Sequence, residues 1–176
     1  MSESNLTNLK RAVIFADEEF DDVELTHPKQ ALEQAGFTVD IATKDKQDMF
    51  GKKGTLAKPN IDIKDLKADD YDLVIVPGGY RSPDRLRIYP EVLEFLQAMD
   101  SAKKVIGAIC HGPWVLISAK LVQGRKMTGH VGTKDDLINA GANFVDQETV
   151  IDDNLVTAPH PTKVEVFTKA ILSKFE

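Results

Sequence analysis

Short, almost entirely apolar runs recur along the chain, separated by amphipathic segments. Three of these runs span residues 12–16, 73–76 and 105–109. They are rich in β-branched residues and bounded by charge or glycine, a pattern typical of strands buried on both faces. A shorter run at 38–42 predicts an outer strand.

The segments between these runs carry apolar residues at helical spacing. The spacing is clearest at Val92, Phe95, Leu96 and Met99, and it returns near the end of the chain at Val164, Phe167, Ile171 and Phe175. Ser82 and Pro83 supply an N-cap candidate and a first-turn proline for a further helix. Because buried strands that alternate with helices need cover on both faces, the pattern predicts an α/β fold with a doubly wound, mostly parallel sheet sandwiched by helices.

Two other segments predict hairpins. Residues 47–60 are polar and glycine-containing, which indicates a hairpin or excursion outside the core. Residues 146–157 alternate around a polar turn and predict a hairpin near the sheet edge. The 176 residues show no repeat or linker, so we expect a single domain over 11–176 after a polar N-terminal extension at 1–10.

Composition narrows the class of protein. Twenty-two Lys and Arg against 28 Asp and Glu give a net charge of −6, which disfavours a nucleic-acid partner. No apolar run reaches the length of a membrane span and the start of the chain lacks a signal core, so we expect a cytoplasmic protein without a membrane partner. A single cysteine excludes an internal disulfide, and the four histidines lack zinc-ligand spacing, so no metal is expected.

The chemistry should lie at the carboxyl ends of the strands, where ligands bind in open α/β sheets. An acidic segment at 17–24 follows the first apolar run, Gly78 and Gly79 follow the second, and Cys110 and His111 follow the third. No run is followed by a glycine-rich phosphate fingerprint, so no dinucleotide cofactor is expected.

Cys110 has the surroundings of a nucleophile elbow. Small residues stand two places before and after it, at Ala108 and Gly112, between an expected strand and an expected helix. A free thiol has a pKa of about 8.5, and a helix N-terminus can lower it to roughly 3.5–7.5. The alternative is an inert cysteine that ends a buried strand, but the elbow pattern favours a reactive thiol.

Three neighbours have candidate roles beside this thiol. Glu24 fits either a capping box that begins at Asp21 or an acid that shares a proton with Cys110. The backbone of Gly79 is suited to an oxyanion hole. His111 adjoins the nucleophile, yet side chains that are adjacent in sequence usually diverge, so its contact with Cys110 is left open.

Taken together, these residues resemble the PfpI family of the class I glutamine amidotransferase-like superfamily. The resemblance is carried by AICHGP at 108–113, FDDVELTHP at 20–28, VPGG at 76–79 and KDDLINAG at 134–141, and it runs from about residue 11 to 175. It implies a flavodoxin-like arrangement of the sheet and an enzyme that needs no cofactor.

The resemblance also implies roles for individual residues. Cys110 is then the nucleophile, His111 its partner and Glu24 the acid beside the thiol, with the amides of Gly79 and His111 as the oxyanion hole. In peptidase-type members an acid from a neighbouring subunit completes the site, and Asp84 stands at the matching place. A homodimer or larger homo-oligomer is therefore expected, although stabilising its own helix is an equally simple role for Asp84.

Family members act as glyoxalases or deglycases on reactive carbonyls and glycation adducts, as intracellular cysteine peptidases, or as stress proteins with an oxidisable cysteine. We expect the first activity, with a small carbonyl or glycated substrate, and keep peptide hydrolysis and redox sensing or chaperone action as alternatives. One departure concerns the substrate. Relatives often carry Ser-Arg-x-Pro after the late strand, whereas this chain reads Ala158-Pro159-His160-Pro161.

Overall fold

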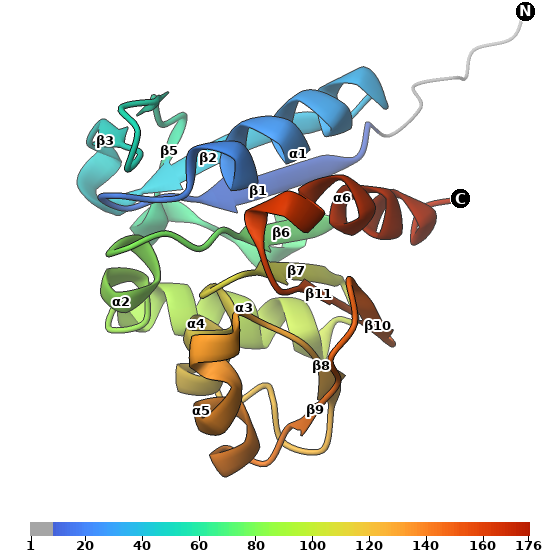
Figure 1. The fold of residues 1–176 in the computed structure, drawn as a ribbon. Coiled ribbons are helices and arrows are strands. Elements are labelled where there is room, and N and C mark those ends of the chain that lie inside the picture. Colours follow the sequence, from blue (N-terminus) through green and yellow to red (C-terminus); the bar gives the residue numbers. More distant parts are fainter. Residues whose placement is uncertain (1–8) are drawn as a thin grey trace, which may run out of the picture.

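A seven-stranded sheet with the order β10-β11-β7-β6-β1-β2-β5 forms the centre of the computed structural model, which describes residues 9–176 (Figure 1). Its strands are β1 (Arg11–Phe15), β2 (Thr38–Thr43), β5 (Ile61–Asp62), β6 (Leu73–Val76), β7 (Val105–Ile109), β10 (Val150–Asp152) and β11 (Leu155–Ala158). Two small sheets pair β3 (Met49–Phe50) with β4 (Leu56–Ala57) and β8 (Lys126–Met127) with β9 (Asn143–Phe144). The helices are α1 (Asp22–Gln34), α2 (Ser82–Leu86), α3 (Pro90–Ser101), α4 (Pro113–Ser118), α5 (Lys134–Asn139) and α6 (Val164–Ser173).

The sheet confirms the predicted doubly wound α/β architecture. Every neighbouring pair in it is parallel except β10 with β11, which form the hairpin expected at the edge. The strand expected on the outside, β2, is instead second from the edge, because the two-residue strand β5 pairs with its end. That pairing is too short to leave a clear signal in the sequence.

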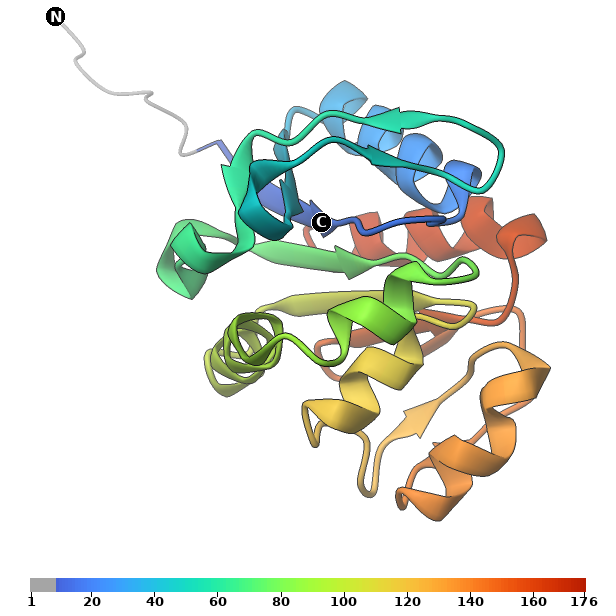
Figure 2. The same cartoon turned by 90° about the vertical axis from the view of Figure 1, so that its left-hand side faces the viewer.

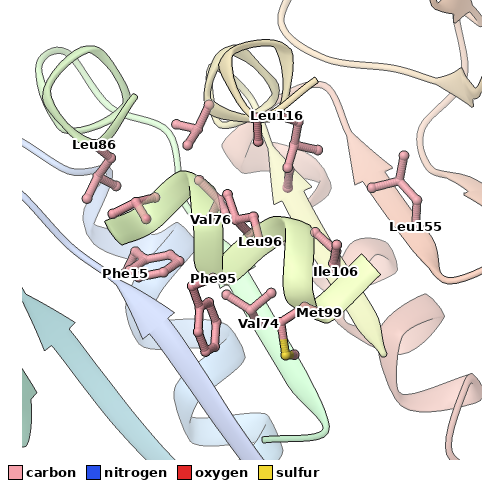
Figure 3. Packing of buried hydrophobic residues seen from close by; sticks show 14 of the residues in the cluster. Phe15, Val74, Val76, Leu86, Phe95, Leu96, Met99, Ile106, Leu116 and Leu155 are labelled. Carbon is pink, nitrogen blue, oxygen red and sulfur yellow. The ribbon is translucent and has the colours of Figure 1, made fainter. Parts of the chain in front are cut away.

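Helices cover both faces of the sheet. In Figure 1, α1 and α6 lie together on one face, and α3 and α4 lie on the other. Under α3, the side chains of Phe95, Leu96 and Met99 pack against residues of β6 and β7 (Figure 3). Buried apolar surface of this kind on both faces is the main term that holds the sheet in place.

The segments outside the sheet follow the predictions with one exception. The 47–60 region forms the antiparallel β3–β4 hairpin. Ser82 is not an N-cap, because α2 begins there after Arg81 and the Ser82 hydroxyl instead accepts from the backbone N–H of Asp17 at 3.0 Å. The expected extension at 1–10 lies almost wholly outside the described residues. Among the helices of residues 9–176, none is both long and apolar enough to cross a membrane.

The register of the sheet brings the ends of three central strands to one edge. Val76 of β6 pairs with Ala108 of β7, and Ala158 of β11 pairs with Ile109 of the same strand. The residues that follow these strands therefore meet at one place. Figure 2 views the molecule from this side, with the β3–β4 hairpin above and α2 and α4 below.

Candidate active site

Cys110 stands on the sharp turn between β7 and α4. Its φ is +62°, in the left-handed region that a residue with a side chain rarely adopts, so the turn stores strain of a few kcal/mol at most. The backbone is held on both sides: the Cys110 N–H donates to Ala158 O at 2.9 Å, and the His130 N–H donates to Cys110 O at 2.8 Å. Cys110 is buried, with 6% of its surface exposed, yet it lines a pocket that opens to solvent.

The small residues of the elbow are needed for close packing. A Cβ at Gly112 would lie 2.3 Å from the carbonyl oxygen of Val76, so only glycine fits beside β6. A Cβ at Gly78 would lie 2.9 Å from Cys110 Cβ and equally close to Glu24 Oε2. The loops after β6 and β7 therefore meet at van der Waals distance around the sulfur.

Glu24 points from the first turn of α1 into this site. Asp21 is the N-cap of α1 and accepts from the N–H groups of Val23 and Glu24, as expected. The capping-box alternative for the Glu24 side chain is wrong, because its Oε2 accepts from the Gly78 N–H at 2.6 Å. Glu24 is fully buried, and its other oxygen, Oε1, has no hydrogen-bond partner within residues 9–176.

The environment favours the protonated form of this carboxyl group. Burial, aided by the negative charge of Asp21, raises the pKa of Glu24 to about 8. Burial also raises the pKa of the Cys110 thiol, and the charge of ionised Glu24 raises it further. This is opposite to the direction that the helix N-terminus alone predicts, because α4 has only six residues and the sulfur is desolvated. Since the second cause disappears when Glu24 is protonated, the two groups titrate as a coupled pair.

His111 does contact the nucleophile. Its Nδ1 lies 3.3 Å from the Cys110 Sγ, so the two adjacent side chains converge at this turn. Burial lowers the pKa of His111 to about 4, with a further contribution from His130. The imidazole is therefore neutral at pH 7, and Trp114 packs against it with ring centroids 5.0 Å apart.

Two backbone N–H groups next to the thiol are the predicted oxyanion-hole donors. Among residues 9–176, neither the Gly79 nor the His111 amide donates to a backbone carbonyl. The His111 amide is directed at the Cys110 sulfur, where it lowers the pKa of the thiol. Gly79 has φ +124°, and a Cβ there would lie 2.3 Å from Glu19 O, so this approach requires glycine.

The pocket has a volume of about 200 Å³ and includes residues that the sequence reasoning missed. His130 and His160 line it with His111, and the three rings stack, with centroids 4.3 Å apart for His111 and His130 and 6.3 Å apart for His130 and His160. His160 follows strand β11 and belongs to the 158–161 segment noted above as a departure from the relatives, although it was given no role in the site. Lys52 enters from the β3–β4 hairpin and gave no comparable signal.

Asp84 is the one predicted site residue that lies apart from the others. It is exposed on α2, and in the described part of the chain it neither lines the pocket nor forms an ion pair or side-chain hydrogen bond. Over the same residues, no group of His, Cys, Asp and Glu side chains has an arrangement that could hold a metal ion.

Comparison with known proteins identifies the family of the chain. The DJ-1/PfpI family matches residues 10–174. The Pyrococcus furiosus protein named deglycase PfpI is 40% identical over 143 residues, which cover 81% of this chain and 86% of the relative. The Bacillus subtilis protein YraA, named provisionally as a cysteine protease, is 39% identical over 165 residues, covering 93% of this chain and 97% of the relative.

A solved structure extends the likeness to three dimensions. A two-domain protein from Anabaena variabilis, with DJ-1/ThiJ/PfpI-like and ferritin-like domains, superposes with a TM-score of 0.92 at 34% identity. The match covers 94% of this chain and 48% of that protein. With the family match over nearly the whole chain, the resemblance inferred from the motifs is confirmed, and this chain belongs to the DJ-1/PfpI family.

Proposed function

We propose that this protein is a cysteine-dependent enzyme, acting without a cofactor, whose substrates are reactive carbonyls or glycation adducts. The observation that carries the proposal is the placement of Cys110 at the mouth of a small pocket, against a buried acid whose pKa is raised to about 8. A carboxyl group tuned to that range exchanges a proton near neutral pH, which is what a general acid–base catalyst requires.

In the proposed first step, the Cys110 sulfur adds to an aldehyde carbon. The S–C bond forms, the C=O π pair moves to oxygen, and the thiol proton passes to that oxygen through the Glu24 carboxyl group to give a hemithioacetal. The amides of Gly79 and His111 stabilise the developing negative charge. For a 2-oxoaldehyde, Glu24 then moves a proton from the former aldehyde carbon to the neighbouring carbon, while the hydroxyl proton of the hemithioacetal passes to the neighbouring ketone oxygen. Water hydrolyses the resulting thioester to a 2-hydroxy acid and free thiol.

The test is methylglyoxal turnover by the purified protein. We expect consumption of methylglyoxal with release of lactate, which is lost in Cys110→Ser and reduced by at least about a hundredfold in Glu24→Gln. Asp146→Asn, an exposed carboxylate distant from the pocket lining, is the matched control and should keep full activity. Oxidation of Cys110 to sulfinic acid by mild peroxide, with no turnover of methylglyoxal or a glycated amino acid, would overturn the proposal in favour of redox sensing.

A second candidate is peptide hydrolysis, favoured by the 3.3 Å contact between Cys110 Sγ and His111 Nδ1. Such a thiol–imidazole pair needs an orienting acid, and in this reading Asp84 of a second subunit supplies it in a homo-oligomer. Hydrolysis of a fluorogenic peptide that is lost in both Cys110→Ser and Asp84→Ala, with unchanged methylglyoxal turnover in Asp84→Ala, would establish this second activity.

A further inference from the structure

The pocket beside Cys110 presents hydrogen-bond donors and positive charge, and no carboxylate is among its lining residues. Its lining consists of Lys52, Gly79, Tyr80, Cys110, His111, His130, His160 and Pro161. In a chain with a net charge of −6, a pocket wall without an acidic side chain is a local exception. The polarity of this wall therefore bears on which substrates it accepts.

The tautomers of two histidines are fixed by the backbone. His130 Nδ1 accepts from the Gly132 N–H at 3.0 Å, and His160 Nδ1 accepts from the Thr162 N–H at 3.3 Å. A neutral imidazole that accepts at Nδ1 carries its proton at Nε2. Burial lowers the pKa of His130, so this ring stays neutral near pH 7. Each of the two rings therefore offers an Nε2–H donor that is not used in these contacts.

Lys52 adds a positive charge to the lining of the pocket. Its Nζ lies 2.7 Å from Asp21 Oδ2 and 4.7 Å from the centre of the Tyr80 ring. An ammonium group has three N–H donors, so the pair with Asp21 leaves donors available. Asp21 also accepts from two backbone N–H groups at the start of α1, and it is not among the residues that line the pocket.

We propose that Lys52, His130 and His160 form a recognition site for an anionic group, so that the preferred substrates are carbonyl compounds that carry a carboxylate. This inference deepens the proposed function, on which it rests: the reacting carbonyl lies at Cys110 and the carboxylate contacts the ammonium and the imidazole N–H groups. Charge-assisted hydrogen bonds of this kind are the strong ones and are specific for an acceptor. Pro159 stands where relatives often carry the arginine, and His160 beside it supplies an N–H donor to the pocket.

Alkylation of Cys110 with two reagents of nearly the same size tests the proposal. Iodoacetate and iodoacetamide differ in one group, a carboxylate in place of an amide. Both react with the same sulfur, so the ratio of their rate constants cancels any change in thiol ionisation. We expect this ratio at Cys110, measured at pH 8 by mass spectrometry, to exceed that of free N-acetylcysteine by about fivefold or more.

Variants assign the effect to the named side chains. Lys52→Met and His160→Phe should each lower the ratio severalfold. His160→Phe keeps an aromatic ring and the Lys52–Asp21 pair, so its effect comes from the lost donor. Lys53→Met is the matched control, because it removes the same charge from an exposed position in the same hairpin and should leave the ratio unchanged.

The outcomes separate this inference from the proposed function. Rapid alkylation by both reagents, at the ratio of the free thiol and unaffected by either variant, would overturn the anion site and leave the nucleophile intact. A folded protein in which iodoacetamide does not alkylate Cys110 at all, while the denatured protein reacts, would instead contradict the proposed function itself.

Discussion

The carboxylate of Glu24 accepts the backbone N–H of Gly78 at 2.6 Å, which joins the first helix to the loop after the central strand β6. This contact exists because Gly78 has no side chain. An added Cβ would lie 2.9 Å from Glu24 Oε2, from Cys110 Cβ and from the His111 backbone nitrogen. The absence of a side chain at position 78 thus lets the acid, the thiol and the backbone amide of His111 approach each other.

Gly78→Ala should therefore disable the site. We expect a loss of about 1–3 kcal/mol in the free energy of unfolding from overpacking, together with at least a tenfold slower alkylation of Cys110 by iodoacetamide. Gly36→Ala is the control, since position 36 has φ +92° but open space around it. That variant should lose stability through backbone strain and keep the reactivity of Cys110. Equal reactivity of the two variants would contradict the prediction.

Glu24 should make the stability of the protein depend on pH. The folded protein holds the Glu24 proton up to about pH 8, whereas an ordinary glutamate loses it near 4.5. The stabilisation is complete below pH 4.5 and is lost as pH rises through 8, by several kcal/mol at about 1.4 kcal/mol per unit of pKa difference.

Glu24→Gln should remove this dependence. The amide is neutral at every pH, so urea unfolding should show a flatter free energy between pH 5 and 9 and a variant more stable than wild type at pH 9. Glu33→Gln, on the same helix but paired with Lys29 on the surface, should retain the wild-type slope. A wild-type stability that does not fall over this range would contradict the raised pKa.

The coupled pair also predicts the pH profile of Cys110 alkylation. In the wild type, Glu24 loses its proton near pH 8, and its negative charge then raises the pKa of the buried Cys110 thiol further, so we expect the alkylation rate to rise only above that pH. Glu24→Gln removes the negative charge that raises the pKa of the thiol, so the midpoint should move to lower pH. A profile that is unchanged by the substitution would show that the two groups do not interact.

Asp22 should control the β3–β4 hairpin. Its carboxylate accepts from the N–H groups of Lys53 and Thr55, each at 3.0 Å. Asp22→Ala leaves these donors without a partner and should cost about 1–3 kcal/mol, with faster hydrogen exchange at residues 49–57. Asp48→Ala, an exposed position in the same region, should leave the exchange rates unchanged. Protection of the hairpin in Asp22→Ala would show that other contacts hold it.

Much of the sheet could be read from the sequence because its central strands are buried on both faces. Residues 73–76 and 105–109 are continuous apolar runs for that reason, and both became strands. Short pairings such as β5 with β2 involve two residues, too few to leave a periodic pattern. The prediction of Ser82 as an N-cap was wrong because its hydroxyl has a partner distant in sequence, the N–H of Asp17.

The candidate site, like the sheet, could be predicted from the sequence only in part. Cys110, His111, Glu24 and Gly79 could be placed together because parallel strands end at one edge and each residue follows or faces such an end. The side-chain direction of Glu24 depends on an acceptor contact with Gly78, 54 residues away, so its local sequence left two readings open. Lys52 lies in an irregular hairpin whose docking depends on the tertiary contacts of Asp22, and no local pattern reports such contacts.

The attachment of the β3–β4 hairpin, which carries Lys52, affects how the sequence of this protein can change in evolution. Its two strands pair only with each other, and a single carboxylate at the start of α1 accepts from two of its turn amides. With Lys52 in the role proposed above, insertions, deletions or substitutions in this hairpin would alter substrate selectivity while the central strands and the thiol keep their positions. Selectivity and chemistry can therefore evolve at separate rates on this scaffold.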